Sequence, residues 1–146
     1  KLLKLELTES ILLESIEATI KIMNDLKMTG IRFSLDDFGT GYSSLSYLKN
    51  LPINTLKIDR TFVKDICVDD NDKQIVKTLI NMAHSMNMTV VAEGVEEQNQ
   101  LDLLANFSCD EIQGYLLSKP VPAGEMLEML AKHKQISLQL TSWIDT

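Results

Sequence analysis

The 146-residue sequence contains few of the residues on which many catalytic and metal sites depend. Its two cysteines, Cys67 and Cys109, are isolated and lack the spacing typical of a metal site, which favours free thiols in a reducing compartment. Its two histidines, His84 and His133, both fall on expected helices, where a surface or helix-end role is more common than ligation. The sequence therefore offers no histidine as a general base.

Positive charge and long apolar runs are also scarce. The 14 Lys and Arg residues against 21 Asp and Glu residues give a formal net charge of −7, which disfavours a non-specific nucleic-acid binder because no basic surface would neutralise the phosphates. No apolar run approaches the roughly 18 residues of a membrane span. With 45% hydrophobic and 24% charged residues, the composition is typical of a globular domain. We expect a cytoplasmic protein, and a membrane anchor upstream in a longer parent is compatible with this.

The most informative stretch is the run Asp36-Asp37-Phe38-Gly39-Thr40-Gly41. It follows an apolar strand expected at residues 31–35, and the two acids are expected where that strand opens into a turn. Adjacent carboxylates repel each other unless a positive charge lies between them, and a divalent cation is the usual solution. The run therefore predicts a metal site followed by a glycine loop.

Expected strands and helices alternate along the chain. The strands are expected at residues 3–8, 31–35, 55–59, 89–92 and 111–115. Helical periodicity is expected at residues 12–26, 44–50, 71–86, 97–107 and 123–133. Gly30 is a plausible C-terminal stop for the first helix, and Asn71 with Gln74 resembles a capping box for the third. The alternation predicts parallel βα units of an α/β fold.

Polar residues lie near the C-terminal ends of these strands. They are Glu6, Asp36, Lys57, Glu93 and Gln113. Parallel strands are buried on both faces, so a purely structural sheet would keep such positions apolar. The active sites of (β/α) barrels and of open α/β sheets lie at this end of the strands. We interpret the set as a site made of acids, one cation and one amide.

These motifs resemble those of the EAL-domain cyclic di-GMP phosphodiesterases, from about Leu5 to about Ala123. The stretches that carry the resemblance are Leu5-Glu6-Leu7-Thr8-Glu9-Ser10, the run from Asp36 to Leu45, Leu56-Lys57-Ile58-Asp59, Ala92-Glu93-Gly94-Val95-Glu96 and Gln113-Gly114-Tyr115. The resemblance implies a bacterial signalling enzyme that uses two divalent ions, Mg²⁺ or Mn²⁺. It would open one phosphodiester bond of cyclic di-GMP and give the linear dinucleotide pGpG.

The resemblance also implies a role for each matching residue. The implied metal ligands are Glu6, Asp36, Asp37 and Glu93, with Asp36 shared between the two ions. The implied catalytic residues are Lys57, Glu93 and Gln113, of which Lys57 would polarise the attacking water and Gln113 would support the site through hydrogen bonds. Glu9 would anchor the loop after Asp37. The implied substrate-site loop comprises Phe38, Gly39, Thr40 and Gly41.

The chain departs from the family in length. A complete barrel needs about 250 residues and eight strands, and the expected strands here do not include those that carry the Glu-Ala-Leu signature, its nearby Arg and an Asn ligand. We therefore expect a partial TIM-like (β/α) barrel, in which residues 1–133 form the C-terminal part of an EAL domain and residues 134–146 form a tail. The tail could be a strand, a helix, a linker or a partner contact.

Three consequences are expected from this truncation. The fragment alone would be inactive, because metal ligands are missing. Its open sheet edges and exposed barrel interior would favour a homodimer or exchange of elements. The parent protein could carry an upstream sensor or GGDEF-type domain.

Two other functions remain open. One is a non-catalytic EAL module that senses cyclic di-GMP or regulates a partner protein, although the acids and the glycine loop are intact. The other is an unrelated metal-dependent barrel enzyme of the enolase type, which the intact loop after Asp36 and Asp37 disfavours.

Overall fold

The computed structural model describes residues 3–8, 16–39 and 48–141, and the side chains of residues 3–8, 17–39 and 48–132. Its five strands form one parallel sheet in the order β1-β2-β3-β4-β5. The elements are β1 Lys4–Thr8, α1 Ile16–Met28, β2 Arg32–Phe38, β3 Thr55–Ile58, α3 Arg60–Lys64, α4 Asp70–Ser85, β4 Thr89–Glu93, α5 Gln98–Asn106, β5 Glu111–Gln113 and α6 Ala123–Thr141. A parallel sheet in sequence order is the arrangement of a (β/α) barrel, so the expected α/β fold is confirmed.

The core lies where the central strands meet the helices that connect them. All four residues of β3 are buried, as are Val90, Val91 and Ala92 of β4. On α4, Val76, Ile80 and Ala83 recur at spacings of four and three and form one buried face, as an amphipathic helix requires. By contrast, β1 and β5 alternate between exposed and half-buried residues, because each lies at an edge of the sheet.

Strand β2 is longer than expected. It runs through both acids and ends at Phe38, so the expectation that Asp36 and Asp37 lie in a turn is wrong. Its pairing with β3 shifts register between Leu35 and Phe38, and Asp37 has a φ of 54°, in the left-handed region. This irregularity is a β-bulge, in which one extra residue is accommodated within the strand.

Helix ends differ from the expected pattern in two places. The N-cap of α4 is Asp69, whose side chain accepts hydrogen bonds from the backbone N–H groups of Asn71 and Asp72, so the expected capping box at Asn71 is wrong. A short helix, α3, follows β3 and was not expected; its N-cap is Asp59, which accepts from Thr61 N. The expected stop after α1 is confirmed at Gly30, where φ is 91°.

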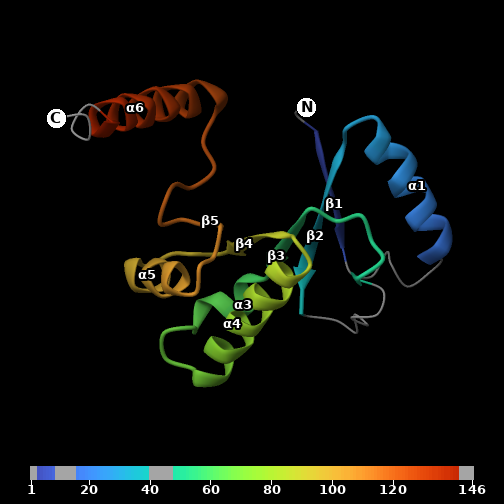
Figure 1. Ribbon diagram of the computed structural model, residues 1–146. Coiled ribbons are helices and arrows are strands. Elements are labelled where there is room, and N and C mark those ends of the chain that lie inside the picture. The colour runs from blue at the N-terminus through green and yellow to red at the C-terminus, as the bar shows by residue number, and fades with distance from the viewer. Residues whose placement is uncertain (1–2, 9–15, 40–47, 142–146) are drawn as a thin grey trace.

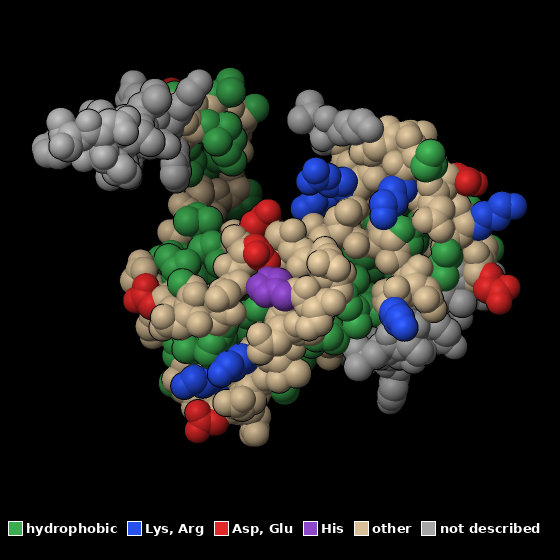
Figure 2. Space-filling model, in the orientation of Figure 1, with side chains coloured by type: hydrophobic (Ala, Val, Ile, Leu, Met, Phe, Trp, Pro, Cys, Tyr) green, Lys and Arg blue, Asp and Glu red, His purple; other side chains and the backbone are tan. Residues whose placement is uncertain are grey.

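Helix α6 continues to Thr141, beyond the expected end at residue 133. Figure 1 shows it standing apart from the sheet, at the end of the extended segment that follows β5. Hydrophobic side chains lie on its surface (Figure 2), among them Met126, Leu127 and Leu130. Within the described ranges, no helix combines the length and the apolar character that a membrane crossing requires.

Candidate metal centre

Lys57 is the centre of the candidate site. It lies on the central strand β3 and is 7% exposed. Its Nζ atom is 2.8 Å from Asp36 Oδ1 on β2 and 2.8 Å from Glu93 Oε1 on β4. It is also 3.1 Å from Glu6 Oε2 on β1. Four neighbouring parallel strands therefore each contribute one charged group near their C-terminal ends, where the sequence predicted the site.

The bulge in β2 brings a further acid to the site. In a regular strand, Asp36 and Asp37 would point to opposite faces of the sheet. Because Asp37 has a positive φ, that alternation is broken. Asp36, Asp37 and Glu93 each offer a carboxylate oxygen, and these three atoms lie within 4.8 Å of one another. This group of acids could hold a metal ion.

Asp59 joins the acids from the other side of Asp37. Burial raises the pKa of Asp37, and the negative charges of Asp36 and Asp59 and a hydrogen bond to Asp59 raise it further. For Asp59, burial acts to raise the pKa, but hydrogen bonds from Thr61 outweigh it, and the pKa lies below its ordinary value. The two neighbouring carboxyl groups therefore have pKa values shifted in opposite directions.

The protonation of Lys57 follows from the same contacts. Burial acts to lower the pKa of Lys57, but hydrogen bonds to Asp36, Glu93 and Glu6 raise it above its ordinary value. The side chain is therefore a fixed ammonium group. It is an electrostatic partner and a hydrogen-bond donor, and it cannot accept a proton near neutral pH.

The charges of this cluster do not balance. One ammonium group, on Lys57, contacts the carboxyl groups of Glu6, Asp36 and Glu93, and the carboxyl group of Asp37 lies beside those of Asp36 and Glu93. Oxygen ligands of this kind suit hard divalent cations such as Mg²⁺ and Mn²⁺. The donor set and its excess negative charge therefore fit a divalent metal.

A pocket of about 290 Å³ opens beside these acids. It is lined by Asp37, Asp59, Arg60, Glu93, Gly94, Glu96, Gln113, Gly114 and Tyr115. Gln113, predicted to support the site, thus lies on the same cavity as Asp37 and Glu93, two of the acids that could hold a metal ion. Tyr115 is 58% exposed, and Lys119 Nζ lies 5.6 Å from the centre of its ring.

The segment after Glu93 approaches its neighbours so closely that two glycines are required. A Cβ atom on Gly94, where φ is +70°, would lie 2.5 Å from Arg60 Cβ. A Cβ atom on Gly114 would lie 2.1 Å from Val95 O. The Val95 backbone is also bonded on this side, donating to Gln113 O and accepting from Leu116 N. The loop that begins at Glu93 is therefore held on both flanks.

The other predicted site residues are placed as follows. Phe38 is the last residue of β2 and is 4% exposed in the core, so it is a strand residue and not a loop residue. Gly39 follows with a φ of 100°, and the Phe62 ring lies against the space where its side chain would be. Glu9, Thr40 and Gly41 lie outside the described residues. Asp59 was missed as a site residue, although it ends the strand expected at residues 55–59.

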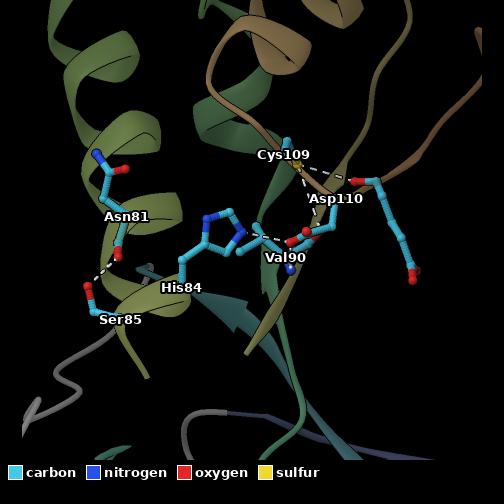
Figure 3. Close-up of polar contacts among 7 residues, drawn as sticks. Asn81, His84, Ser85, Val90, Cys109 and Asp110 are labelled. Carbon is cyan, nitrogen blue, oxygen red and sulfur yellow. Dashed lines mark hydrogen bonds and ion pairs between the residues drawn. The ribbon is translucent and has the colours of Figure 1, made fainter. Parts of the chain in front are cut away.

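A second polar cluster lies at the opposite ends of the strands (Figure 3). His84, in the last turn of α4, places Nε2 2.8 Å from Asp110 Oδ2. The same Asp110 oxygen accepts a hydrogen bond from Val90 N. His84 is therefore a helix-end residue, as the sequence predicted, and it links α4 to the segment that enters β5. The His133 side chain lies outside the described residues.

Comparison with known proteins agrees with this geometry. The model of the EAL domain family matches residues 1–120. The cyclic di-GMP phosphodiesterase NbdA of Pseudomonas aeruginosa is 44% identical over 132 residues, which are 90% of this chain and 17% of NbdA. The chain therefore spans less than a fifth of that relative's length.

Solved structures are similar in the same way. The structure of the PaMucR phosphodiesterase in complex with c-di-GMP superposes with a TM-score of 0.80 at 42% identity, covering 84% of this chain and 50% of that one. The Klebsiella pneumoniae BlrP1 complex with manganese and cyclic di-GMP gives a TM-score of 0.74 at 32% identity, covering 80% and 30%. By its sequence and by its fold, this chain belongs to the EAL domain family.

Proposed function

We propose that this chain is the C-terminal part of a metal-dependent phosphodiesterase that hydrolyses cyclic di-GMP to linear pGpG. The observation that carries the proposal is the convergence of Asp36, Asp37 and Glu93, whose oxygens lie within 4.8 Å of one another beside Lys57. Membership of the EAL domain family and the activity named for NbdA support it.

Two divalent ions, Mg²⁺ or Mn²⁺, would be held by Glu6, Asp36, Asp37 and Glu93. When bound, such ions act as Lewis acids on phosphoryl oxygens and lower the pKa of a coordinated water. The manganese complex of BlrP1 supports a divalent metal in this family. The absence of a histidine from the described site is consistent with this chemistry, because the nucleophile does not then require a histidine base.

The residues of the chain itself would have three tasks. Lys57, as a fixed cation, holds Asp36 and Glu93 in place and can donate a hydrogen bond to an oxygen that enters the site. Gln113 lines the pocket and would add neutral hydrogen bonds there. The acids would place negative charge at one end of the sheet. Because that charge repels a phosphodiester, the substrate would bind only when cations are also bound.

The activity would belong to a longer protein. The chain covers half of the PaMucR structure, and both edge strands, β1 and β5, present backbone groups that a completed barrel would pair. We therefore propose that the 146 residues alone turn over little or no substrate, and that they dimerise through the open sheet and the apolar surface of α6. The parent could carry a GGDEF-type domain, as the name of the bifunctional relative MucR suggests, and would act in the cytoplasm in second-messenger signalling.

The test compares hydrolysis of cyclic di-GMP by this chain and by a chain extended upstream by about 100 residues, with Mg²⁺ or Mn²⁺. We expect turnover to pGpG only with the extended chain. Binding of cyclic di-GMP by the extended chain without hydrolysis would replace the enzyme with a non-catalytic sensor or regulator. A lack of both binding and hydrolysis would refute the proposal.

A further inference from the structure

The side chain of Gln100 is buried between two helices that follow neighbouring strands of the metal site. It is 4% exposed, although most glutamines are on the surface. Its Oε1 atom accepts hydrogen bonds from Glu96 N at 2.8 Å and from Glu97 N at 3.0 Å. Its Nε2 atom donates to Val63 O at 3.3 Å and to Lys64 O at 3.1 Å. The two donors and two acceptor positions of the amide are therefore all used.

Only part of this pattern is ordinary helix capping. Gln100 is the third residue of α5, and a glutamine there commonly accepts a hydrogen bond from the N-cap residue, here Glu97. That function needs the oxygen alone and leaves the NH₂ group to water. Here the NH₂ group instead donates to two carbonyls at the end of α3, Val63 O, which also accepts from Ile66 N, and Lys64 O. Gln100 therefore joins the start of α5 to the end of α3.

These two helices are the continuations of the strands that carry the site. Helix α3 begins directly after Asp59, two residues beyond Lys57. Glu93 ends β4, and the first N–H bound by Gln100 belongs to Glu96, three residues later. A hollow of about 350 Å³, lined in part by Arg60, Lys64 and Gln100, lies between the two segments. The two segments also approach each other where Gly94 faces Arg60, and the Gln100 amide joins them by hydrogen bonds, a tie that lies beside the hollow.

We propose that Gln100 is a positioning residue for the metal centre, which fixes the loop after Glu93 relative to the strand of Lys57 and so sets the Glu93 carboxylate against Asp36 and Asp37. The inference rests on the proposed function, since it assigns Gln100 to the metal-binding machinery of that site. Residues that orient metal ligands from outside the coordination sphere typically contribute about 10- to 100-fold to metal affinity.

The test measures Mn²⁺ affinity of the 146-residue chain by titration with electron paramagnetic resonance. Gln100→Leu removes the hydrogen bonds to both segments with a side chain of similar size. Gln100→Glu keeps the accepting oxygen but loses the NH₂ donors. The matched control is Leu104→Ala, on the same helix and fully buried, which lowers stability without touching the tie. All variants are measured under conditions in which circular dichroism shows them folded.

We expect Gln100→Leu to weaken Mn²⁺ binding at least about 10-fold, while Leu104→Ala changes it less than about 2-fold. The Mn²⁺ affinity of Gln100→Glu should lie between those of the other two variants. If Gln100→Leu does not fold, the comparison of Gln100→Glu with Leu104→Ala decides the result. Equal weakening in the Gln100 variants and in Leu104→Ala would reduce the residue to ordinary core packing and overturn the proposal, as would unchanged affinity in the Gln100 variants.

A second readout separates this inference from the proposed function. If the 146-residue chain binds no Mn²⁺, the same titration is made on the chain extended upstream by about 100 residues, where a lack of binding would count against the metal centre itself. The tie is then judged by hydrogen exchange at the backbone amides of Glu96 and Glu97, without metal. Faster exchange in Gln100→Leu than in Leu104→Ala supports the tie, and equal exchange in the two overturns it.

Discussion

Asp37 and Asp59 line the same pocket, and the negative charge of Asp59 helps to raise the pKa of Asp37, after burial and the charge of Asp36. The two residues come from neighbouring strands, one at the bulge of β2 and the other just after β3. Two carboxylates that share a site repel each other, and a positive charge placed between them relieves that repulsion. The pair therefore marks Asp59 as a member of the site in addition to its role as the N-cap of α3.

Two substitutions separate those roles of Asp59. Asp59→Asn keeps an oxygen that can cap α3 but removes a negative charge, so we expect weaker Mn²⁺ binding with little change in stability. Asp59→Ala loses both functions and should also lower the free energy of unfolding by about 1 kcal/mol. Calorimetric titration and urea denaturation measure the two effects. Equal Mn²⁺ affinity in Asp59→Asn and the wild type would limit Asp59 to capping.

A bound metal ion should replace part of the stabilisation that Lys57 gives to the acids around it. Lys57→Met leaves the acids around it without their cation, and we expect the metal-free chain to lose about 3 kcal/mol of stability, at the lower end for a broken buried ion pair because Glu6 stays half exposed to water. Saturating Mn²⁺ should then raise Tm more in Lys57→Met than in the wild type. A smaller rise in the variant would contradict the electrostatic balance proposed for the site.

Turnover in the extended chain should depend on each charged residue of the centre. Asp36→Ala, Asp37→Ala and Lys57→Ala are each expected to lower kcat at least about 100-fold, the scale on which one preorganised electrostatic contact acts. Their effects should not add, because groups that act as a unit fail together. Lys132→Ala, an exposed lysine on α6, is the control. A near-wild-type rate in any of the three would remove that residue from the mechanism.

Acid should loosen the contact between His84 and Asp110. Burial acts to raise the pKa of Asp110, but hydrogen bonds from Val90 N and His84 outweigh it, so the pKa lies below its ordinary value of 3.8. A depressed folded-state pKa contributes stability above pH 3.8 that is lost as the pH falls further. Urea denaturation at pH 3 and pH 6 should therefore show a smaller loss of stability for Asp110→Asn than for the wild type.

Two glycines of this chain should respond in opposite ways to the same substitution. Gly114→Ala forces a Cβ atom to within 2.1 Å of Val95 O and should lower stability by at least about 2 kcal/mol. Gly124→Ala, in the first turn of α6 with no atom within 4 Å of the new carbon, should raise it by up to about 1 kcal/mol. Thermal denaturation of both variants is the measurement. A harmless Gly114→Ala would mean that the loop after Glu93 can move away from β5.

The positions of the strands and of the acids could be predicted from the sequence because both follow local patterns. Parallel strands need apolar runs, and charged residues at Glu6, Asp36 and Glu93 interrupt those runs only near their ends. Since the C-terminal ends of parallel strands meet at one edge of a sheet, their proximity followed from the expected topology.

The remaining features depend on pairing that local patterns do not contain. The bulge at Asp37 arises from the register of β2 against β3, and the five-residue α3 is too short to show a helical period. For the N-cap of α4, several residues of one acidic run could supply the accepting oxygen, and only the geometry selects Asp69. The tie made by Gln100 spans 36 and 37 residues of sequence and has no local signature.

The placement of Glu6 on β1 has a consequence for how the chain behaves at its open edge. An edge strand held on one side is the first part of a sheet to detach, and when β1 detaches, one of the acids beside Lys57 leaves with it. If Glu6 helps to hold a metal ion, binding of the ion would also hold β1 on the sheet. Metal binding and attachment of the edge strand would then be coupled. The rate of proteolysis near the N-terminus would then report whether the site around Lys57 holds a metal ion.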